Sequence, residues 1–432
     1  MNSKYFYAKN IKTELDGYVL GQEKGTRAIA MAIAQHIQQT FFDWYPQELS
    51  QTDNILLIGP TGCGKTETYR ILKKIEKEIE CPIAIFNMLD YAPTNSWQGE
   101  SITKIFDDII KQSLEICFSM GYNENADIAV FKKKIIDIAN RAIIFLDETD
   151  KIAMEGDGKN RSFFKDYQSN LLKMIEGNTY EVSDYTFKKK YHKTNEDGEQ
   201  LLYTESKTLD NMKVNTTHMM FIFMGAFDGI QNITRFRLDQ ENKQKKETQN
   251  TNYQGTHLGF MINVKANKSK PVKKYTYEEL IPSQEDIIQY GFLRELIGRI
   301  PVRTVYEPLN VDKLVHILLN SKTSAYKKYQ QRFSQNGHHM LRCNREALKE
   351  IARIAIKRGT GARGLMNIFS ELLQDTQYDL SGNRDQIHCL LRGKEIREHK
   401  PPLLHNVTKK HKRNKKKKEK TNPSDNIIKY QK

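Results

Sequence analysis

The sequence contains 432 residues, of which 38% are hydrophobic and 10% aromatic, so a largely disordered chain is excluded. This length exceeds one ordinary hydrophobic core, and we therefore expect two or three domains. The formal net charge is +15, and much of it lies in residues 409–420, which hold nine Lys or Arg and a single Glu.

The first predicted element is a helical stretch over residues 8–41, where apolar residues recur at helix-like spacings. Residues 54–58 form a short apolar run that ends in a glycine-rich turn, as a buried parallel strand does. A helix is predicted from residue 66 to about residue 80. Later segments continue this alternation, with strands predicted at 83–86, 142–146 and 219–224 and helices at 101–118 and 126–140. Such alternation indicates a three-layer α/β domain with a parallel β-sheet between helices.

Two stretches interrupt this alternation, because residues 184–214 and 235–274 are polar and are predicted to be long loops. From about residue 309 the chain becomes helical and predicts a separate, mainly α domain. Its expected helices span residues 311–336, 345–358 and 362–378. The basic end of the chain could contact nucleic acid or an acidic membrane surface, or could be a solvated, disordered tail.

A complete phosphate-loop motif, G-x-x-x-x-G-K-[ST], lies between the first predicted strand and the helix that follows it. Its eight residues are Gly59, Pro60, Thr61, Gly62, Cys63, Gly64, Lys65 and Thr66. The glycines let backbone N–H groups converge on phosphate oxygens, at the positive end of a helix dipole. Lys65 is predicted to reach the β and γ phosphates of ATP, and Thr66 to bind Mg²⁺. A chance glycine turn is the alternative, and the strand–helix context argues against it.

A second nucleotide motif ends the strand predicted at 142–146. Asp147 is predicted to hold Mg²⁺ through water, and Glu148 to act as the general base that polarises the attacking water. Acidic residues at strand ends are common, so this signal gains its weight from the phosphate loop. Together the two motifs predict an ATPase without saying what hydrolysis drives.

Further characteristic blocks lie at residues 16–22, 147–152, 171–177, 225–229, 291–301 and 360–365. These blocks resemble those of the ClpX-type protein unfoldases of the AAA+ class. Their order and spacing hold from about residue 10 to about residue 383. The resemblance implies a large AAA+ domain over 1–308, a small helical lid domain over 309–395 and a basic tail over 396–432. It also implies a homohexameric ring with a central pore.

The resemblance implies roles for four more residues. Val19 and Leu20 would line the adenine pocket. Arg299 matches the arginine finger, which acts on ATP bound to a neighbouring subunit, where a guanidinium offsets the charge that develops in phosphoryl transfer. Arg363 matches the sensor-2 arginine of the small domain. For both arginines a structural role is the alternative.

The pore loop of the family corresponds to residues 91–100 and keeps an aromatic residue and a glycine at Trp97 and Gly99, with Gln98 in place of an aliphatic residue. Trp97 would press on an unfolded chain, unless it is buried in ordinary packing. Residues 184–214 correspond to the basic pore-entrance loop, or are a solvated surface. No polar sensor-1 residue can be named near Met224.

Three residues of the polar stretch at 235–274, Leu258, Gly259 and Phe260, are similar to the loop by which the family docks on the ClpP peptidase. The alternative is a weakly packed loop. We expect no counterpart of the family's N-terminal zinc-binding domain, which leaves substrate recruitment open. Five scattered cysteines without a C-x-x-C pair agree with its absence and are typical of a reducing compartment.

Neither a signal peptide nor an apolar stretch of about 18 residues is found, so a cytoplasmic protein without a membrane partner is expected. The favoured function is an ATP-dependent unfoldase that acts on tagged or unfolded proteins and delivers them to a ClpP-like peptidase. One alternative is an ATPase that remodels nucleic-acid complexes. The other is a modulator of a host Clp system that does not itself support degradation.

Overall fold

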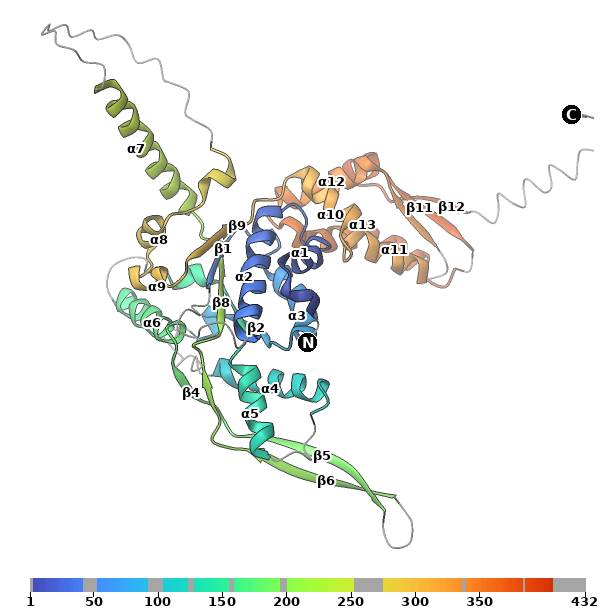
Figure 1. Cartoon of the computed structure of the whole chain (residues 1–432). Coiled ribbons are helices and arrows are strands. Elements are labelled where there is room, and N and C mark those ends of the chain that lie inside the picture. Colours follow the sequence, from blue (N-terminus) through green and yellow to red (C-terminus); the bar gives the residue numbers. More distant parts are fainter. Residues whose placement is uncertain are drawn as a thin grey trace, which may run out of the picture. The chain divides into compact units, whose positions relative to one another are not determined.

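The computed structural model describes residues 3–41, 53–91, 104–122, 128–154, 159–194, 200–251, 275–335, 339–383 and 385–406. The chain divides into two compact units, Met1–Pro308 and Leu309–Lys432. In Figure 1 the first unit runs from blue to yellow and the second is orange to red. Among the described residues, none of the helices combines the length and the apolar composition needed to cross a bilayer.

The first unit is built on a five-stranded parallel sheet in the order β2-β3-β8-β1-β9. Its strands are β1 (Ile55–Ile58), β2 (Ile83–Asn87), β3 (Ile143–Asp147), β8 (Met220–Gly225) and β9 (Val302–Val305). Every residue of β1 and β8 is buried, because helices cover both faces. Their carboxyl ends, with that of β3, share one edge of the sheet, where ligands bind in open α/β folds.

Alternate strand residues pack into two cores. Ile55 and Leu57 join the core formed with α1 (Ala8–Asp16), α2 (Glu23–Phe41) and α3 (Lys65–Ile79). Leu56 and Ile58 join the core on the other face, whose helices are α4 (Lys104–Ser119), α5 (Ile128–Ala139), α6 (Lys159–Ile175), α8 (Gln284–Tyr290) and α9 (Arg294–Gly298). The predicted three-layer α/β architecture with a parallel sheet is confirmed.

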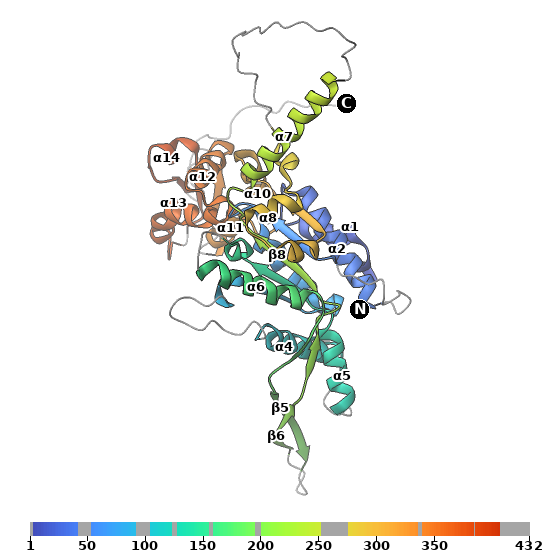
Figure 2. The same cartoon turned by 90° about the vertical axis from the view of Figure 1, so that its left-hand side faces the viewer.

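The expectation of a long loop over residues 184–214 is wrong. Two ten-residue strands, β5 (Tyr185–Thr194) and β6 (Gln200–Leu209), pair as an antiparallel ribbon, and β4 (Thr179–Glu181) pairs with β7 (Lys213–Asn215) at its base. Figures 1 and 2 show the ribbon extending from the end of the unit where α4 and α5 lie. Its many charged residues hide the apolar pattern by which a strand is recognised, although its aromatic and β-branched residues favour one.

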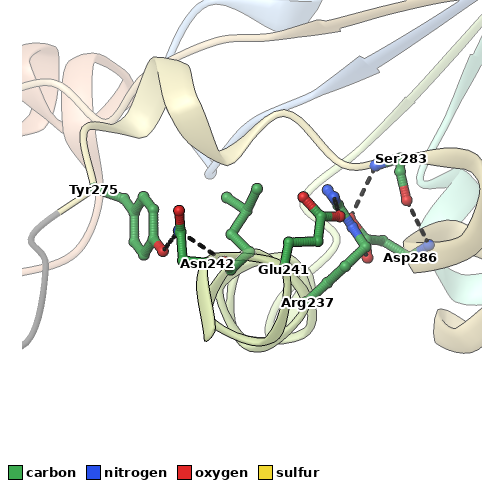
Figure 3. A network of polar contacts seen from close by, with 7 residues as sticks. Arg237, Glu241, Asn242, Tyr275, Ser283 and Asp286 are labelled. Atoms are coloured by element: carbon green, nitrogen blue, oxygen red, sulfur yellow. Dashed lines mark hydrogen bonds and ion pairs between the residues drawn. The ribbon is translucent and has the colours of Figure 1, made fainter. Parts of the chain in front are cut away.

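The polar stretch that begins at residue 235 is also not a loop at its start, because helix α7 (Ile230–Thr251) continues through it. Arg237 ties this helix to α8 through two bonds to the Asp286 carboxylate, at 2.9 and 3.0 Å (Figure 3). Arg237 also pairs with Glu241 one turn along α7, and Asn242 donates to the Tyr275 hydroxyl at 2.9 Å. These contacts explain how a helix with a weak apolar face is held.

The second unit has its own core and combines helices with a three-stranded sheet. Its helices are α10 (Val311–Asn320), α11 (Ala325–Gln335), α12 (Arg345–Lys357), α13 (Leu365–Asp379) and α14 (Gly393–Arg397). The sheet is β10 (Met340–Cys343), β11 (Ile387–Leu391) and β12 (Leu403–Asn406). The prediction of a tail from residue 396 is wrong for its first residues, because β12 pairs antiparallel with β11.

Two stretches that were each predicted as one helix contain two helices. The stretch 8–41 is interrupted between α1 and α2, where Gly21 has a φ of 78°, and the stretch 311–336 is interrupted between α10 and α11. Short 3-10 helices complete the described secondary structure: η1 (Ser3–Phe6), η3 (Met88–Tyr91), η4 (Thr149–Ile152), η5 (Tyr277–Leu280) and η6 (Gly361–Gly364).

Candidate nucleotide-binding site

The phosphate loop joins β1 to α3 in a conformation that requires its glycines. A Cβ at Gly59 would lie 2.8 Å from the Tyr306 carbonyl oxygen and 2.9 Å from the Cys63 Sγ. Gly62 and Gly64 have φ angles of 78° and 113°, in the left-handed region that favours glycine. The motif therefore folds as a tight turn directly at the carboxyl edge of the sheet.

Lys65 closes this loop on itself. Its ammonium group donates to the Gly59 carbonyl and, at 3.1 Å, to the Pro60 carbonyl. Gly64 is the N-cap of α3 and has no side chain with which to bond the first-turn N–H groups of that helix. A cation and the open N-terminus of a 15-residue helix thus lie next to each other, a combination that fits a phosphate group.

Two oxygen ligands lie together beside this turn. The Thr66 Oγ1 is 3.3 Å from the Oδ2 of Asp147, the last residue of β3, at the same carboxyl edge of the sheet. The other carboxylate oxygen of Asp147 accepts the N–H of Glu148 at 2.9 Å, and this bond fixes the orientation of the carboxylate. A hydroxyl and a carboxylate are hard oxygen donors of the kind that Mg²⁺ prefers, so this pair fits a magnesium ion.

Glu148 turns the chain out of β3 with a φ of 58°, an unusual value for a residue with a side chain. The next turn is held by Asp150, which is buried and accepts the N–H of Ala226 at 3.2 Å. A Cβ at Gly225 would lie 2.5 Å from the Asp150 Oδ1, so the 3-10 helix η4, which follows β3, packs directly against the end of β8. Met224, near which the sequence offers no polar sensor-1 residue, is buried in the core.

Two residues of the site were missed by sequence reasoning. The Gln22 amide donates to the carbonyls of Cys63 and Glu307, at 3.2 and 2.9 Å, and accepts the Glu307 N–H at 2.7 Å. Tyr306 is fully buried beneath the loop, with its hydroxyl 2.8 Å from the Thr68 Oγ1. Burial raises the pKa of Tyr306, so its hydroxyl stays neutral and available for that hydrogen bond.

Of the residues predicted to line the adenine pocket, Val19 is buried and packs against the phosphate loop. Its Cγ1 is 3.1 Å from the position a Cβ would take at Gly64. Leu20 is half-buried. Cys63 is buried inside the loop, and burial raises the pKa of its thiol. A neutral thiol is a poor nucleophile, so Cys63 serves the loop as a small packing residue.

Arg299 lies at the opposite end of the strands, beside the amino end of β1. Its carbonyl accepts the side-chain amide of Asn54, which immediately precedes β1, whereas Gly59 immediately follows β1. Five residue steps along an extended strand separate the two positions by about 16 Å, which exceeds the reach of an arginine side chain. The guanidinium donates to the Glu176 carboxylate at 2.9 Å and is 47% exposed. Arg299 is therefore not part of the nucleotide site of its own chain.

Arg363 belongs to the second unit, in η6, and its side chain is exposed. A Cβ on the following residue, Gly364, would lie 1.9 Å from the Thr360 Oγ1, which explains the glycine of this block. Other predicted residues lie outside the described part of the chain: Trp97, Gln98, Gly99, Leu258, Gly259, Phe260 and the basic stretch 409–420.

The phosphate loop, the acidic strand end and the sheet order define a P-loop ATPase of the AAA class. A family profile described as "AAA domain (Cdc48 subfamily)" matches residues 50–303, and the chain belongs to this family. The ATP-dependent Clp protease ATP-binding subunit ClpX of Treponema denticola is 27% identical over 394 residues, which cover 90% of this chain and 80% of that protein. The chain is accordingly a ClpX-like AAA+ ATPase.

Proposed function

We propose that this ATPase is a protein unfoldase and translocase that works as a homohexameric ring. The observation that carries the proposal is the distance between Arg299 and the phosphate loop, at opposite ends of β1. An arginine that cannot reach the nucleotide of its own chain, but is half-exposed at the edge of the sheet, is suited to reach the nucleotide of a neighbour. A ring supplies each site with such a neighbour.

Within one subunit the roles follow from charge and position. Lys65 neutralises the β and γ phosphates, while Thr66 and Asp147 hold Mg²⁺, which supplies further neutralisation of phosphate charge. The Glu148 carboxylate accepts a proton from the attacking water. Val19 and Leu20 contact the adenine. Arg363 reports the nucleotide state to the small domain, which we place at 309–395 after a large domain over 1–308.

The sequence supports the mechanical part of the proposal. Trp97, with Gln98 and Gly99, grips the substrate chain in the pore, and Leu258, Gly259 and Phe260 dock on a ClpP-like peptidase through apolar contacts. Each cycle of ATP hydrolysis moves the pore loop that carries Trp97 and so pulls on a protein whose folded state is only marginally stable.

The test is the ATP-dependent loss of fluorescence of a folded fluorescent protein carrying an unfolded tail, measured with and without a ClpP-type peptidase. Unfolding should require Mg²⁺ and should be absent in Lys65→Ala. Glu148→Gln should bind ATP without turning it over, and serves as the matched control for binding. DNA stimulation of ATP turnover that is lost on deletion of residues 407–432, without any unfolding of the protein substrate, would contradict the proposal. The deletion starts at 407 because β12 ends at Asn406.

A further inference from the structure

The side chain of Arg299 is held by a single carboxylate oxygen. Its Nε and Nη2 donate to the Glu176 Oε1, at 3.2 and 2.9 Å. Both bonds use one edge of the planar guanidinium, and Nη1, at the opposite corner, takes part in neither. Glu176 therefore fixes the orientation of the group without occupying all of its donors.

The position of Glu176 is itself determined by packing. It immediately follows α6 and precedes Gly177, whose φ of 96° turns the chain sharply. A Cβ at Gly177 would lie 2.6 Å from the Thr217 Oγ1, so this turn is closely packed against the segment that leads into β8. The carboxylate thus projects from a well-defined turn at the end of a 17-residue helix.

The main chain of Arg299 has an anchor of its own. The buried Asn54 amide donates to the Arg299 carbonyl at 3.0 Å, while its carbonyl oxygen accepts the N–H of Phe221 at 2.9 Å. This double contact ties the end of α9 to the sheet without any contribution from Glu176. What Glu176 adds is the orientation of a long side chain that would otherwise sample many rotamers.

We propose that Glu176 is a positioning residue for Arg299: it holds the guanidinium by its Nε–Nη2 edge and leaves the Nη1 corner to meet the phosphate on the neighbouring subunit. This inference rests on the proposed role of Arg299 as a finger that acts between subunits. The group is ordered before the nucleotide arrives, so less conformational freedom is lost in the transition state.

The experiment measures ATPase kinetics of the full chain in its assembled form. Glu176→Ala should lower kcat about ten-fold while the KM for ATP stays within about two-fold, because it removes orientation and not ground-state binding. Glu176→Gln retains an oxygen that accepts both bonds and should keep at least about half of the wild-type kcat. Glu176→Asp, which draws the oxygen back by one methylene, should fall between them and keeps the test open if Glu176→Ala does not fold.

A matched control is Glu371→Ala in the second unit. Glu371 accepts two bonds of 2.8 Å from Arg358, and the two side chains are 54% and 46% exposed, close to the values of Glu176 and Arg299. This variant loses a comparable surface pair and should keep the wild-type kcat.

Arg299→Ala distinguishes a failure of the proposed finger from a failure of the proposed positioning residue. It should lower kcat by roughly 10³-fold, and adding Glu176→Ala to it should cause no further loss. If Arg299→Ala keeps wild-type turnover, the proposed finger is wrong. If Arg299→Ala is inactive while Glu176→Ala behaves like Glu371→Ala, only the positioning role is overturned. Faster turnover in Glu176→Ala and Glu176→Gln would show that the carboxylate restrains the finger, and would also overturn it.

Discussion

Two arginine–carboxylate pairs in the first unit use the same chemistry in different surroundings. Arg237 on α7 donates to both oxygens of Asp286, whose side chain is 1% exposed and also accepts the N–H of Ser283 (Figure 3). Arg299 donates to one oxygen of Glu176, and these side chains are 47% and 40% exposed. The first pair is a buried structural connection between two helices, and the second is an accessible surface pair.

The difference in burial explains why one pair stabilises the fold while the other is accessible to a partner. Burial of the Asp286 carboxyl acts to raise its pKa, but the hydrogen bonds from Arg237, from the Ser283 N–H and from Thr234 outweigh it and hold the pKa below its usual value. Breaking such a pair leaves an uncompensated buried charge. An exposed pair is solvated on both sides and contributes little to folding, so its partners are available for another interaction.

The largest expected effect is that of Arg237→Ala on stability. It should lower the free energy of unfolding by about 3 kcal/mol, because Asp286 would keep its charge in a buried place without its main partner. Denaturant unfolding followed by circular dichroism measures the change. Glu241→Ala is the control, since it removes only the exposed partner of Arg237, at 44% exposure, and should cost far less. Equal losses in both variants would remove the contrast between buried and exposed pairs.

A second prediction concerns the pH dependence of stability that His36 causes. The pKa of His36 lies above that of Asp286, so the two contributions must be measured separately. Burial lowers the pKa of His36 to about 4, below its usual value of 6.5, while its Nε2 lies 2.8 Å from the Arg141 carbonyl oxygen. Below about pH 6.5 the His36 imidazole is protonated in the unfolded chain but stays neutral in the folded chain. The free energy of unfolding therefore falls as the pH drops from about 6.5 towards 4. The full effect is on the order of 3 kcal/mol.

His36→Gln keeps a donor for the Arg141 carbonyl and cannot titrate. Its free energy of unfolding, measured in denaturant at several pH values, should therefore change less between pH 7 and pH 4 than that of the wild type. Parallel pH profiles would mean that His36 is not buried in its neutral form.

The acid sensitivity of the buried pair gives a third prediction. The pKa of the Asp286 carboxyl is lower in the folded state than in the unfolded state. Its contribution to stability is therefore complete at pH values above its unfolded-state pKa, and it is lost as the pH falls through its folded-state pKa. In the His36→Gln background, Asp286→Asn should lower stability at pH 7 and flatten the remaining decline below pH 4. The readout is the denaturation midpoint as a function of pH.

The smallest expected effect is that of Glu176→Ala on stability. Removing one partner of an exposed pair should change the free energy of unfolding by about 0.5 kcal/mol or less. Thermal and denaturant unfolding check this value. A loss comparable to that of Arg237→Ala would mean that Glu176 is structural, and the contrast between the two pairs would fail.

Much of the nucleotide site could be predicted from local pattern. The phosphate loop is eight contiguous residues between a fully apolar strand and a helix, and Asp147 and Glu148 directly follow another apolar run. Strands buried on both faces appear in sequence as short uninterrupted apolar segments, which is why β1, β3 and β8 were predicted within a residue or two.

Strands with polar residues escaped prediction. β9 has four residues, includes Arg303 and lies at the edge of the sheet, so it carries no continuous apolar run. The β5–β6 ribbon and the sheet of the second unit likewise depend on a partner strand more than on their own composition. Helix α7 escaped because tertiary contacts through Arg237 support it, where its own polar composition does not.

By itself the sequence determined the ATPase motifs, the alternation of strands and helices, and the resemblance that identifies the AAA class, because each depends on residues close together in the chain. Only the tertiary structure decided that Gln22 braces the phosphate loop against Glu307, 285 residues away, and that Glu176 meets Arg299 across 123 residues. Such contacts arise when sheet order and helix ends bring distant segments together, and no local periodicity encodes them.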